Sequence, residues 1–301
     1  MSDTIQNLKR KIGKARTLDS VVRTMKTLAA LNIRQYEEAI RSLDEYYRNV
    51  EFGLAASLHE ERQPFRDRAV SGKQTIPAIA VVFGSDQGLV GQFNDLLAEV
   101  ALAALKRLQG RFSVLSIGER MQQRLSDHGI RSELLFDVPN AVSAITPLTG
   151  DLLSAIEKIR EREALFELYL FYHMPVSGEL YQPVSKRVLP LDESWAHEIM
   201  TNATPSAKPF PEMPNGAETT RWALVREYLF VSLFRACAES LAAENASRLS
   251  AMQRAEKNID ELLDEFTRSY NERRQADIDE ELFDVISGFQ ALDDTTKHRN
   301  L

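Results

Sequence analysis

Cysteine is almost absent from this chain, because Cys237 is the only one among 301 residues. A single cysteine excludes an internal disulfide framework and a cysteine metal cluster, which fits a reducing cytoplasm. Cys237 stands between Ala236 and Ala238 in a stretch with a helical pattern. In such a stretch the thiol is expected to be a packed core group and not a nucleophile.

Several other features are missing, and each absence excludes a class of protein. The five histidines never have the H-E-x-x-H spacing of a metal site. No apolar run reaches about 18 residues, and the N-terminus has no signal-peptide core. The net charge of −7 argues against general nucleic-acid binding. We therefore expect no metal, no cofactor, no nucleic acid and no direct insertion into lipid, in a chain that is cytosolic or reaches a membrane only through partners.

Glycine and proline are missing from residues 217–287, a run of 71 residues that lies between Gly216 and Gly288. Globular helices average about 11 to 12 residues, so one helix of this length, roughly 105 Å, must extend beyond its own globular domain. Its apolar side chains recur at steps of three and four residues in a stripe that drifts, which suits a coiled coil with a break in its repeat. The stripe comprises Trp222, Val225, Leu229, Met252, Ala255, Ile259, Leu262, Phe266, Ile278, Leu282, Val285 and Phe289.

The N-terminal segment 1–62 predicts a second long helix, capped by Ser2, Asp3 or Thr4. Apolar and aromatic residues repeat every seven positions, and a second set falls four residues later, as in a heptad seam. The two sets are Leu8, Ala15, Val22, Ala29, Tyr36, Leu43 and Val50, and Ile12, Ile33, Ile40, Tyr47 and Leu54. Asp19 and Lys26 interrupt the second set. Two long helices with matching seams are expected to pair antiparallel.

The first part of this helix, residues 9–34, contains eight basic residues and only one acidic residue, Asp19. They are Lys9, Arg10, Lys11, Lys14, Arg16, Arg23, Lys26 and Arg34. A basic amphipathic helix can bind a membrane surface or a nucleic acid. The acidic remainder of the chain and the lack of a Trp/Phe insertion face favour an acidic protein partner instead.

Residues 76–200 predict a globular α/β domain with a Rossmann-like, mostly parallel sheet, because strand and helix patterns alternate. The expected strands are 79–83, 112–117, 133–138 and 166–173, with a further one at 181–191. The expected helices are 92–108, 119–127 and 151–162. Four prolines in 202–216 indicate a mobile loop that leads into the C-terminal helix.

The segment 84–94, GSDQGLVGQFN, lies between a predicted strand and a helix, where phosphate-binding loops are found. It lacks the Lys-Ser/Thr ending of a P-loop, and its glycines do not follow G-x-G-x-x-G. Glycines are also needed simply to turn tightly and to let a helix close on a sheet. A nucleotide site is therefore the less favoured interpretation of this loop.

Three segments together resemble the gamma subunit of F-type rotary ATP synthases: residues 8–35, the loop SDQGLVGQFN, and residues 244–292. The resemblance implies a central rotor shaft, formed by an antiparallel coiled coil of segments 1–62 and 217–292, inside the hexamer of alpha and beta catalytic subunits. It also implies an epsilon subunit and the membrane c-ring as partners, a peripheral place on the cytoplasmic side of the cell membrane, and no chemistry of its own.

The same resemblance implies which residues contact partners. Met25 matches a shaft methionine that faces an acidic lever of a catalytic subunit, and Lys26 belongs to the basic run beside it. On the C-terminal helix the matching positions are Arg248, Arg274, Gln275, Asp279 and Glu281. Asp279 stands where the family has a threonine, which indicates a divergent branch, like the alternate sodium- or proton-linked ATPases of some bacteria. Two other classes stay open: a nucleotide-using α/β enzyme with a coiled-coil oligomerisation arm, and a purely structural scaffold.

Overall fold

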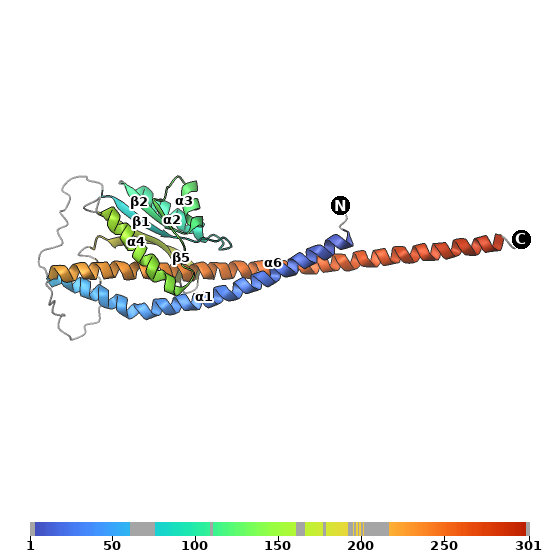
Figure 1. The fold of residues 1–301 in the computed structure, drawn as a ribbon, viewed down its shortest axis with the longest axis horizontal. Coiled ribbons are helices and arrows are strands. Elements are labelled where there is room, and N and C mark those ends of the chain that lie inside the picture. The colour runs from blue at the N-terminus through green and yellow to red at the C-terminus, as the bar shows by residue number, and fades with distance from the viewer. Residues whose placement is uncertain are drawn as a thin grey trace. The chain divides into compact units, whose positions relative to one another are not determined.

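The computed structural model describes residues 4–60, 76–108, 111–160, 166–176, 179–191 and 217–298, together with positions 195, 197, 199 and 201. The chain divides into two compact units. The helical unit comprises Met1–Thr27 and Ser250–Leu301, and the sheet unit comprises Leu28–Leu249. Two long helices, α1 (Ile5–Glu60) and α6 (Ala217–His298), contribute to both units (Figure 1).

The sheet unit contains five strands in the order β3-β2-β1-β4-β5. Strands β1, β2, β3 and β4 pair in parallel, and β5 joins β4 in the antiparallel direction. The strands are β1 (Ala78–Phe83), β2 (Phe112–Ile117), β3 (Leu134–Phe136), β4 (Glu167–Val176) and β5 (Glu179–Leu189). This arrangement confirms the predicted α/β fold with a mostly parallel sheet.

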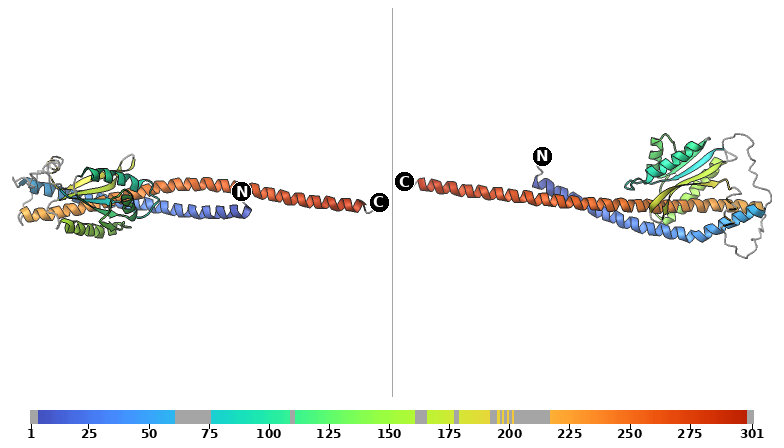
Figure 2. Two further views of the ribbon diagram at one scale, coloured as in Figure 1. Left: turned by 90° about the horizontal axis from the view of Figure 1, so that it is seen from above. Right: turned by 180° about the vertical axis from the view of Figure 1, so that it is seen from behind.

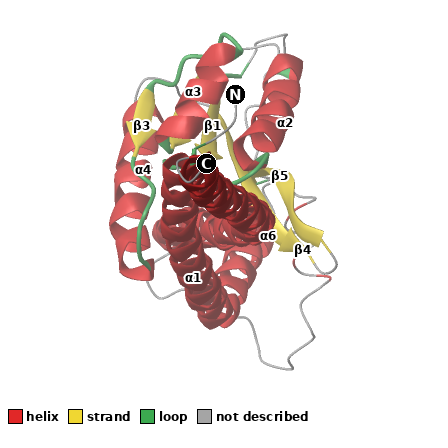
Figure 3. Cartoon of the chain, turned by 90° about the vertical axis from the view of Figure 1, so that its right-hand side faces the viewer, coloured by secondary structure: helices red, strands yellow, loops and turns green. Residues whose placement is uncertain are grey.

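Helices cover both faces of the sheet, so that the central strands are buried on both sides, as parallel sheets require. On one face Ala80 and Val82 pack against α2 (Phe93–Arg107) and α3 (Glu119–Asp127). On the other face Val81 and Phe83 belong to the larger core. That core includes residues of α4 (Ile145–Arg160) and of the α1 and α6 segments of this unit, and Figure 3 shows the layers in cross-section.

Within the sheet unit, α6 is buried on nearly all sides from residue 231 to residue 247. The drifting stripe predicted for this helix does not describe that segment. Small side chains make the burial possible, because Ala238, Ala242 and Ala243 let neighbouring backbones approach closely. Cys237 lies in the same segment, and its thiol is a packed core group as predicted.

The two long helices run antiparallel in each unit, which Figure 2 lets the reader follow. In the helical unit the Lys11 ammonium lies 5.5 Å from the centre of the Phe266 ring, while Lys26, further along α1, pairs with Glu256, further back on α6. In the sheet unit Tyr46 donates a hydrogen bond to Glu227 over 2.6 Å. The first set of the predicted heptad seam is buried or half-buried throughout.

Element boundaries differ from the sequence prediction at several points. Helix α4 begins at Ile145 and not at 151, because Pro147 falls in the first turn, where no N–H is needed. Strand β3 is shorter than predicted. Helix α6 continues through Gly288, since one helical glycine costs only about 1 kcal/mol. Thr4 is one of the three N-caps predicted for α1, and its hydroxyl accepts a hydrogen bond from the Asn7 backbone N–H at 3.4 Å. Ser2 and Asp3 lie outside the described residues.

Five members of the predicted stripe on α6 are exposed and are not core residues: Trp222, Leu262, Ile278, Leu282 and Val285. Trp222 is 54% exposed and lies beneath the Arg160 guanidinium, and Leu262 is 44% exposed. The predicted loop 202–216 lies outside the described residues. None of the helices in the described part of the chain combines the length and the apolar character needed to cross a membrane.

Candidate functional site

The loop after β1 uses its polar groups to hold itself together. The Ser85 amide donates to the Asn94 side-chain oxygen at 3.0 Å, and the Asn94 amide group donates back to the Ser85 hydroxyl at 2.8 Å. Asp86 accepts the backbone N–H of Glu119 at 3.0 Å and that of Val138 at 2.8 Å. Its carboxylate thereby occupies the N-terminus of α3, where a phosphate would otherwise be attracted.

Two glycines in this region serve close packing. A Cβ atom on Gly84 would lie 2.2 Å from the Met121 Cβ, and one on Gly118 would lie 2.6 Å from the Ser85 backbone. Gly118 also has a φ of 96°, which side-chain-bearing residues rarely adopt. The glycines therefore bring α3 against the sheet, and the geometry argues against a phosphate cradle.

The same loop is fastened to α6 by buried hydroxyl groups. The Ser247 hydroxyl donates to the carbonyl of Val90, and the Tyr181 hydroxyl lies 3.2 Å from the Ser247 oxygen. About two turns of helix earlier, the Ser240 hydroxyl donates to the carbonyl of Phe83 at 3.1 Å. These contacts, called here the loop joint, tie the end of β1 to the long helix.

His173 on β4 supports the loop joint through its contacts with Phe93 and Tyr181. Its Nε2 donates to the carbonyl of Phe93 at 2.8 Å, and its ring lies 4.3 Å from the Phe93 ring. Burial lowers the pKa of His173 to about 4, because an imidazolium would lose its hydration there. The histidine is therefore a neutral packing group.

Charged side chains are buried on α6 beside the loop joint. Arg248 donates to Glu244 on the same helix and lies 3.4 Å from the Asn245 side-chain oxygen. Its side chain is only 14% exposed. Burial raises the pKa of the Glu244 carboxyl although Arg248 opposes that shift. Arg248, a predicted partner contact, therefore already has hydrogen-bond partners within the sheet unit.

In the helical unit, the two predicted contact residues of α1 differ in their surroundings. The Met25 side chain is half-buried. Lys26 forms an ion pair with Glu256 of α6. Of the eight basic residues, Arg23 also pairs within this unit, and Arg34 pairs with Glu38 in the sheet unit.

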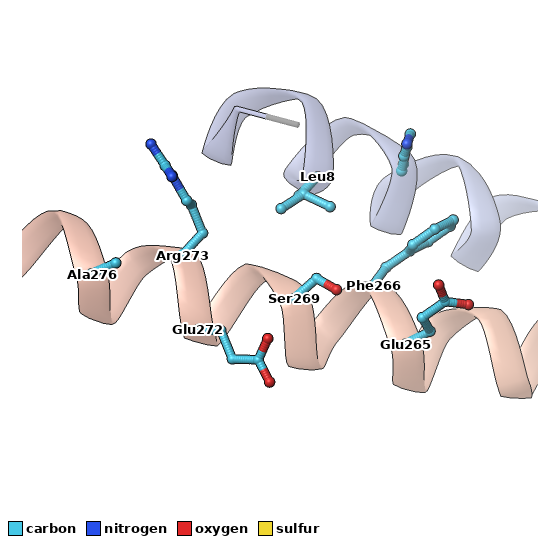
Figure 4. A pocket seen from close by; sticks show the side chains of 8 residues that line it. Leu8, Glu265, Phe266, Ser269, Glu272, Arg273 and Ala276 are labelled. Carbon is cyan, nitrogen blue, oxygen red and sulfur yellow. The ribbon is translucent and has the colours of Figure 1, made fainter. Parts of the chain in front are cut away.

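The four remaining predicted contacts lie together on α6, and all are exposed: Arg274, Gln275, Asp279 and Glu281. A shallow hollow lies between the first turns of α1 and residues 265–276 of α6. Arg274 and Gln275 belong to that stretch of α6, and Asp279 and Glu281 come after it. Figure 4 shows Leu8 of α1 pointing toward Ser269 and Phe266 in this hollow. Ala276 is the last residue of α6 that lines it.

Beyond that point α6 exposes large apolar side chains. Every side chain from 278 to 287 is exposed, and the apolar ones range from 45% exposed for Ile278 to 72% for Phe283. The others are Leu282, Val285 and Ile286. Such a series of exposed apolar groups marks an interaction surface.

The structure therefore groups the predicted residues in three places and does not bring them into one site. Sequence reasoning did not find the loop joint, because serines 240 and 247 carry no motif and are identified only by the carbonyls they contact. Among the described residues, no group of three His, Cys, Asp or Glu side chains is arranged to hold a metal.

Comparison with known proteins agrees with this arrangement. A family model described as ATP synthase matches residues 4–292. The chain belongs to the ATP synthase family.

Known relatives in this family are ATP synthase gamma chains. That of Rubrobacter xylanophilus is 27% identical, over 96% of this chain and 98% of its own length. That of Geobacter metallireducens is 26% identical, over 96% of this chain and 99% of its own. A chain in the cryo-EM structure of the Euglena gracilis mitochondrial ATP synthase OSCP/F1/c-ring assembly has a TM-score of 0.62 at 15% identity. The match covers 96% of this chain and 94% of that one, and shows the shared fold.

Proposed function

We propose that this chain is the central shaft of a rotary ATP synthase, which turns inside the ring of alpha and beta catalytic subunits and carries out no bond chemistry itself. The observation that supports this most strongly is the exposed apolar surface of α6 between 278 and 286. Large apolar side chains on an exposed helix are unfavourable in water, so a row of them indicates a partner that covers them. A surrounding ring of subunits would cover them on every side at once.

The adjoining part of α6 supplies polar contacts to the same ring. Arg274 and Gln275 are exposed, and a planar guanidinium and an amide can bond a partner loop with defined geometry. Asp279 lies one turn further on, and Glu281 follows it. These four residues would set the orientation of the shaft, while the apolar side chains supply the buried area.

On α1 a second surface lies beside the seam that meets α6. Arg10, Lys14, Leu18, Val21 and Met25 follow one another at steps of three and four residues, which places them on one helix face. Leu18 is 57% exposed and Val21 is 50% exposed. We propose that an acidic, partly apolar lever of a catalytic subunit binds this face.

Lys26 and Arg248 take part less directly in this proposal. Their charges are already paired, with Glu256 and Glu244 respectively. A ring contact by either residue stays a prediction, and it would involve only the exposed edge of the side chain.

The remaining partners follow from the family. We propose that the sheet unit meets the epsilon subunit and the membrane c-ring, so that the complex holds the chain at the cytoplasmic side of the membrane. Segments 1–62 and 217–292 would form the shaft and 76–200 its globular domain. The alternative, a nucleotide-using enzyme with an oligomerisation arm, is disfavoured by the loop after β1, whose amide and carboxylate groups are already bonded.

Co-purification from the native host tests the proposal. The tagged chain should retain alpha and beta subunits, and a Leu282→Asp/Val285→Asp variant should lose them while its circular dichroism stays unchanged. Glu280→Gln, on the opposite face of the same turn, is the matched control and should retain the ring. Equal retention by the double variant would show that this surface is not covered by the ring.

A further inference from the structure

The seam of α1 is interrupted in the helical unit by two charged residues seven positions apart. Asp19 and Lys26 occupy the second apolar slot of the heptad, where Ile12 and Ile33 stand in the neighbouring repeats. Neither side chain turns fully to solvent, because both are half-buried. A charge in such a position lowers stability unless it has a partner, so the contacts of these two side chains show what compensates for their burial.

Both charged residues are joined to α6 through one cluster. Lys26 pairs with Glu256, whose side chain is only 18% exposed. The Arg23 Nε lies 2.9 Å from an Asp19 oxygen and 3.5 Å from the Glu256 Oε1. Its Nη2 lies 3.8 Å from Asp260. These five residues, Asp19, Arg23, Lys26, Glu256 and Asp260, are called here the seam clamp.

An apolar seam does not determine its own register well. A shift of one heptad leaves apolar residues facing apolar residues, and small seam side chains such as Ala15 resist sliding little. The seam clamp does distinguish the registers. Leu249 and Leu263 lie seven residues on either side of Glu256, so a one-heptad shift would place a leucine against the Lys26 ammonium.

We infer that the seam clamp fixes the register of α1 on α6 within the helical unit, so that torque on one helix passes to the other there without sliding. The inference rests on the proposed shaft function for its purpose, although the register itself is a property of this chain alone. It assigns Lys26 a positioning role within the shaft. Buried or half-buried charges that specify register at some cost in stability are known from coiled coils.

The full-length chain can report its own register through two spin labels. Cysteines replacing Ser20 and Lys257, both exposed and both in the helical unit, would carry the labels, while buried Cys237 stays unmodified. The parent should give one narrow distance distribution. Lys26→Glu should broaden it or shift it by roughly 10 Å, the rise of one heptad along a helix, and Lys26→Glu with Glu256→Lys should restore most of the narrow peak. An unchanged distribution in Lys26→Glu would overturn the inference.

A second variant separates register from stability. Asp19→Ile/Lys26→Ile/Glu256→Leu makes the seam continuously apolar, so its melting temperature should rise while its distance distribution broadens. An ion cluster that merely stabilised the pair would give the opposite result, a lower melting temperature with the register unchanged.

The assembled ATPase gives the functional readout. Lys26→Glu should lower the number of protons pumped per ATP hydrolysed, and the charge-swapped double variant should recover it. If Lys26 acted through a contact with the ring instead, the double variant would still lack that contact and would not recover coupling. The swap of Arg34 and Glu38, an ion pair within α1, is the control and should leave coupling unchanged. Failure of the parent to assemble would contradict the shaft function, whereas the spin-label distances would still decide the register.

Discussion

His173 illustrates how a single side chain can connect the fold to solution conditions. It is fully buried, it bonds the Phe93 carbonyl, and it packs against Tyr181, which in turn reaches Ser247 on α6. The neutral imidazole fits this setting and the imidazolium does not. One histidine therefore makes the joint between the sheet and the long helix dependent on pH.

Stability should fall as the pH drops from about 6.5 to about 4. In this window the unfolded chain binds a proton at His173 while the folded chain, with its pKa lowered to about 4, does not. The loss approaches about 3 kcal/mol below both values, at 1.36 kcal/mol per pKa unit. Urea unfolding at several pH values should show a smaller acid loss for His173→Gln than for the parent. The exposed His128→Gln serves as control, and an equal slope in His173→Gln would rule out this assignment.

Met25→Lys should impair coupling more than folding. The side chain is half-buried on the proposed lever-binding face, so the change removes modest packing and adds a charge near an acidic partner. Assembled complexes should form with near-normal melting temperature but pump fewer protons per ATP. Ser20→Lys, five residues away on another face, should behave as the parent. Loss of assembly with no poorly coupled complex would show that Met25 is only a core residue.

Among the helices and strands, the segment of α6 from 231 to 247 has the most demanding surroundings. It is enclosed by the sheet, the loop after β1 and α1, and it carries buried polar groups on its alanine-rich surface. A hydrogen-bond partner stabilises such a group, and two carbonyls act as partners here: that of Phe83, at the end of β1, for Ser240, and that of Val90, in the following loop, for Ser247. The element is thereby joined to the sheet at defined points and not by apolar packing alone.

Ser240→Ala and Ser247→Ala should each cost about 1 kcal/mol of unfolding free energy, because a buried carbonyl loses its hydroxyl donor. Hydrogen exchange should also become faster in the loop 84–92. Ser42→Ala removes an exposed hydroxyl bond to Ala39 on α1 and should change stability by less than about 0.5 kcal/mol. Equal effects at all three serines would mean that the loop joint adds no more stability than an exposed hydroxyl bond does.

The end of α6 should be sensitive in the complex and insensitive alone. Arg274→Ala and Gln275→Ala should lower ATPase rate or assembly more than Asp279→Thr, because they remove donors for a partner loop. All three residues are exposed, so the isolated chain should unfold as the parent does. Unchanged turnover in all three variants would make this part of the helix a passive solvated segment.

Taken as one chain, the protein forms its helical unit from the two ends of the sequence, and its sheet unit from the continuous segment Leu28–Leu249, which begins in α1 and ends in α6. Both units therefore need α1 and α6 together, and much of their pairing is between residues about 200 positions apart, such as Asn32 with Asn245. Contacts of such long range cost loop-closure entropy when they form, and they slow folding. In the central α/β segment, the polar groups of the loop after β1 form hydrogen bonds within the segment itself.

Titration of the full-length chain with Mg-ATP should therefore give no saturable heat, because the amide and carboxylate groups after β1 are already engaged. The same titration of the chain assembled with its alpha and beta subunits should show binding at the ring. Saturable binding to the chain alone would favour the enzyme alternative and would remove the ground for a non-catalytic shaft.

The absence of glycine and proline from 217–287 and the heptad seam of 1–62 were sufficient to predict two long paired helices, because helix formation depends on local geometry and periodicity. The alternation of strand and helix patterns was likewise sufficient for the parallel sheet. Family resemblance then pointed to the shaft, and the matched family agrees.

Which residue meets which was decided by contacts across the fold. Nothing near Lys26 in the sequence indicates Glu256 as its partner, and nothing near Ser247 indicates the Val90 carbonyl. A periodic pattern shows which face of a helix is buried but not what lies against it, so the enclosure of 231–247 and the exposure of Trp222 were both missed. Register, hydroxyl partners and the pairing of buried charges depend on the distance between segments far apart in the chain, and only the folded arrangement sets that distance.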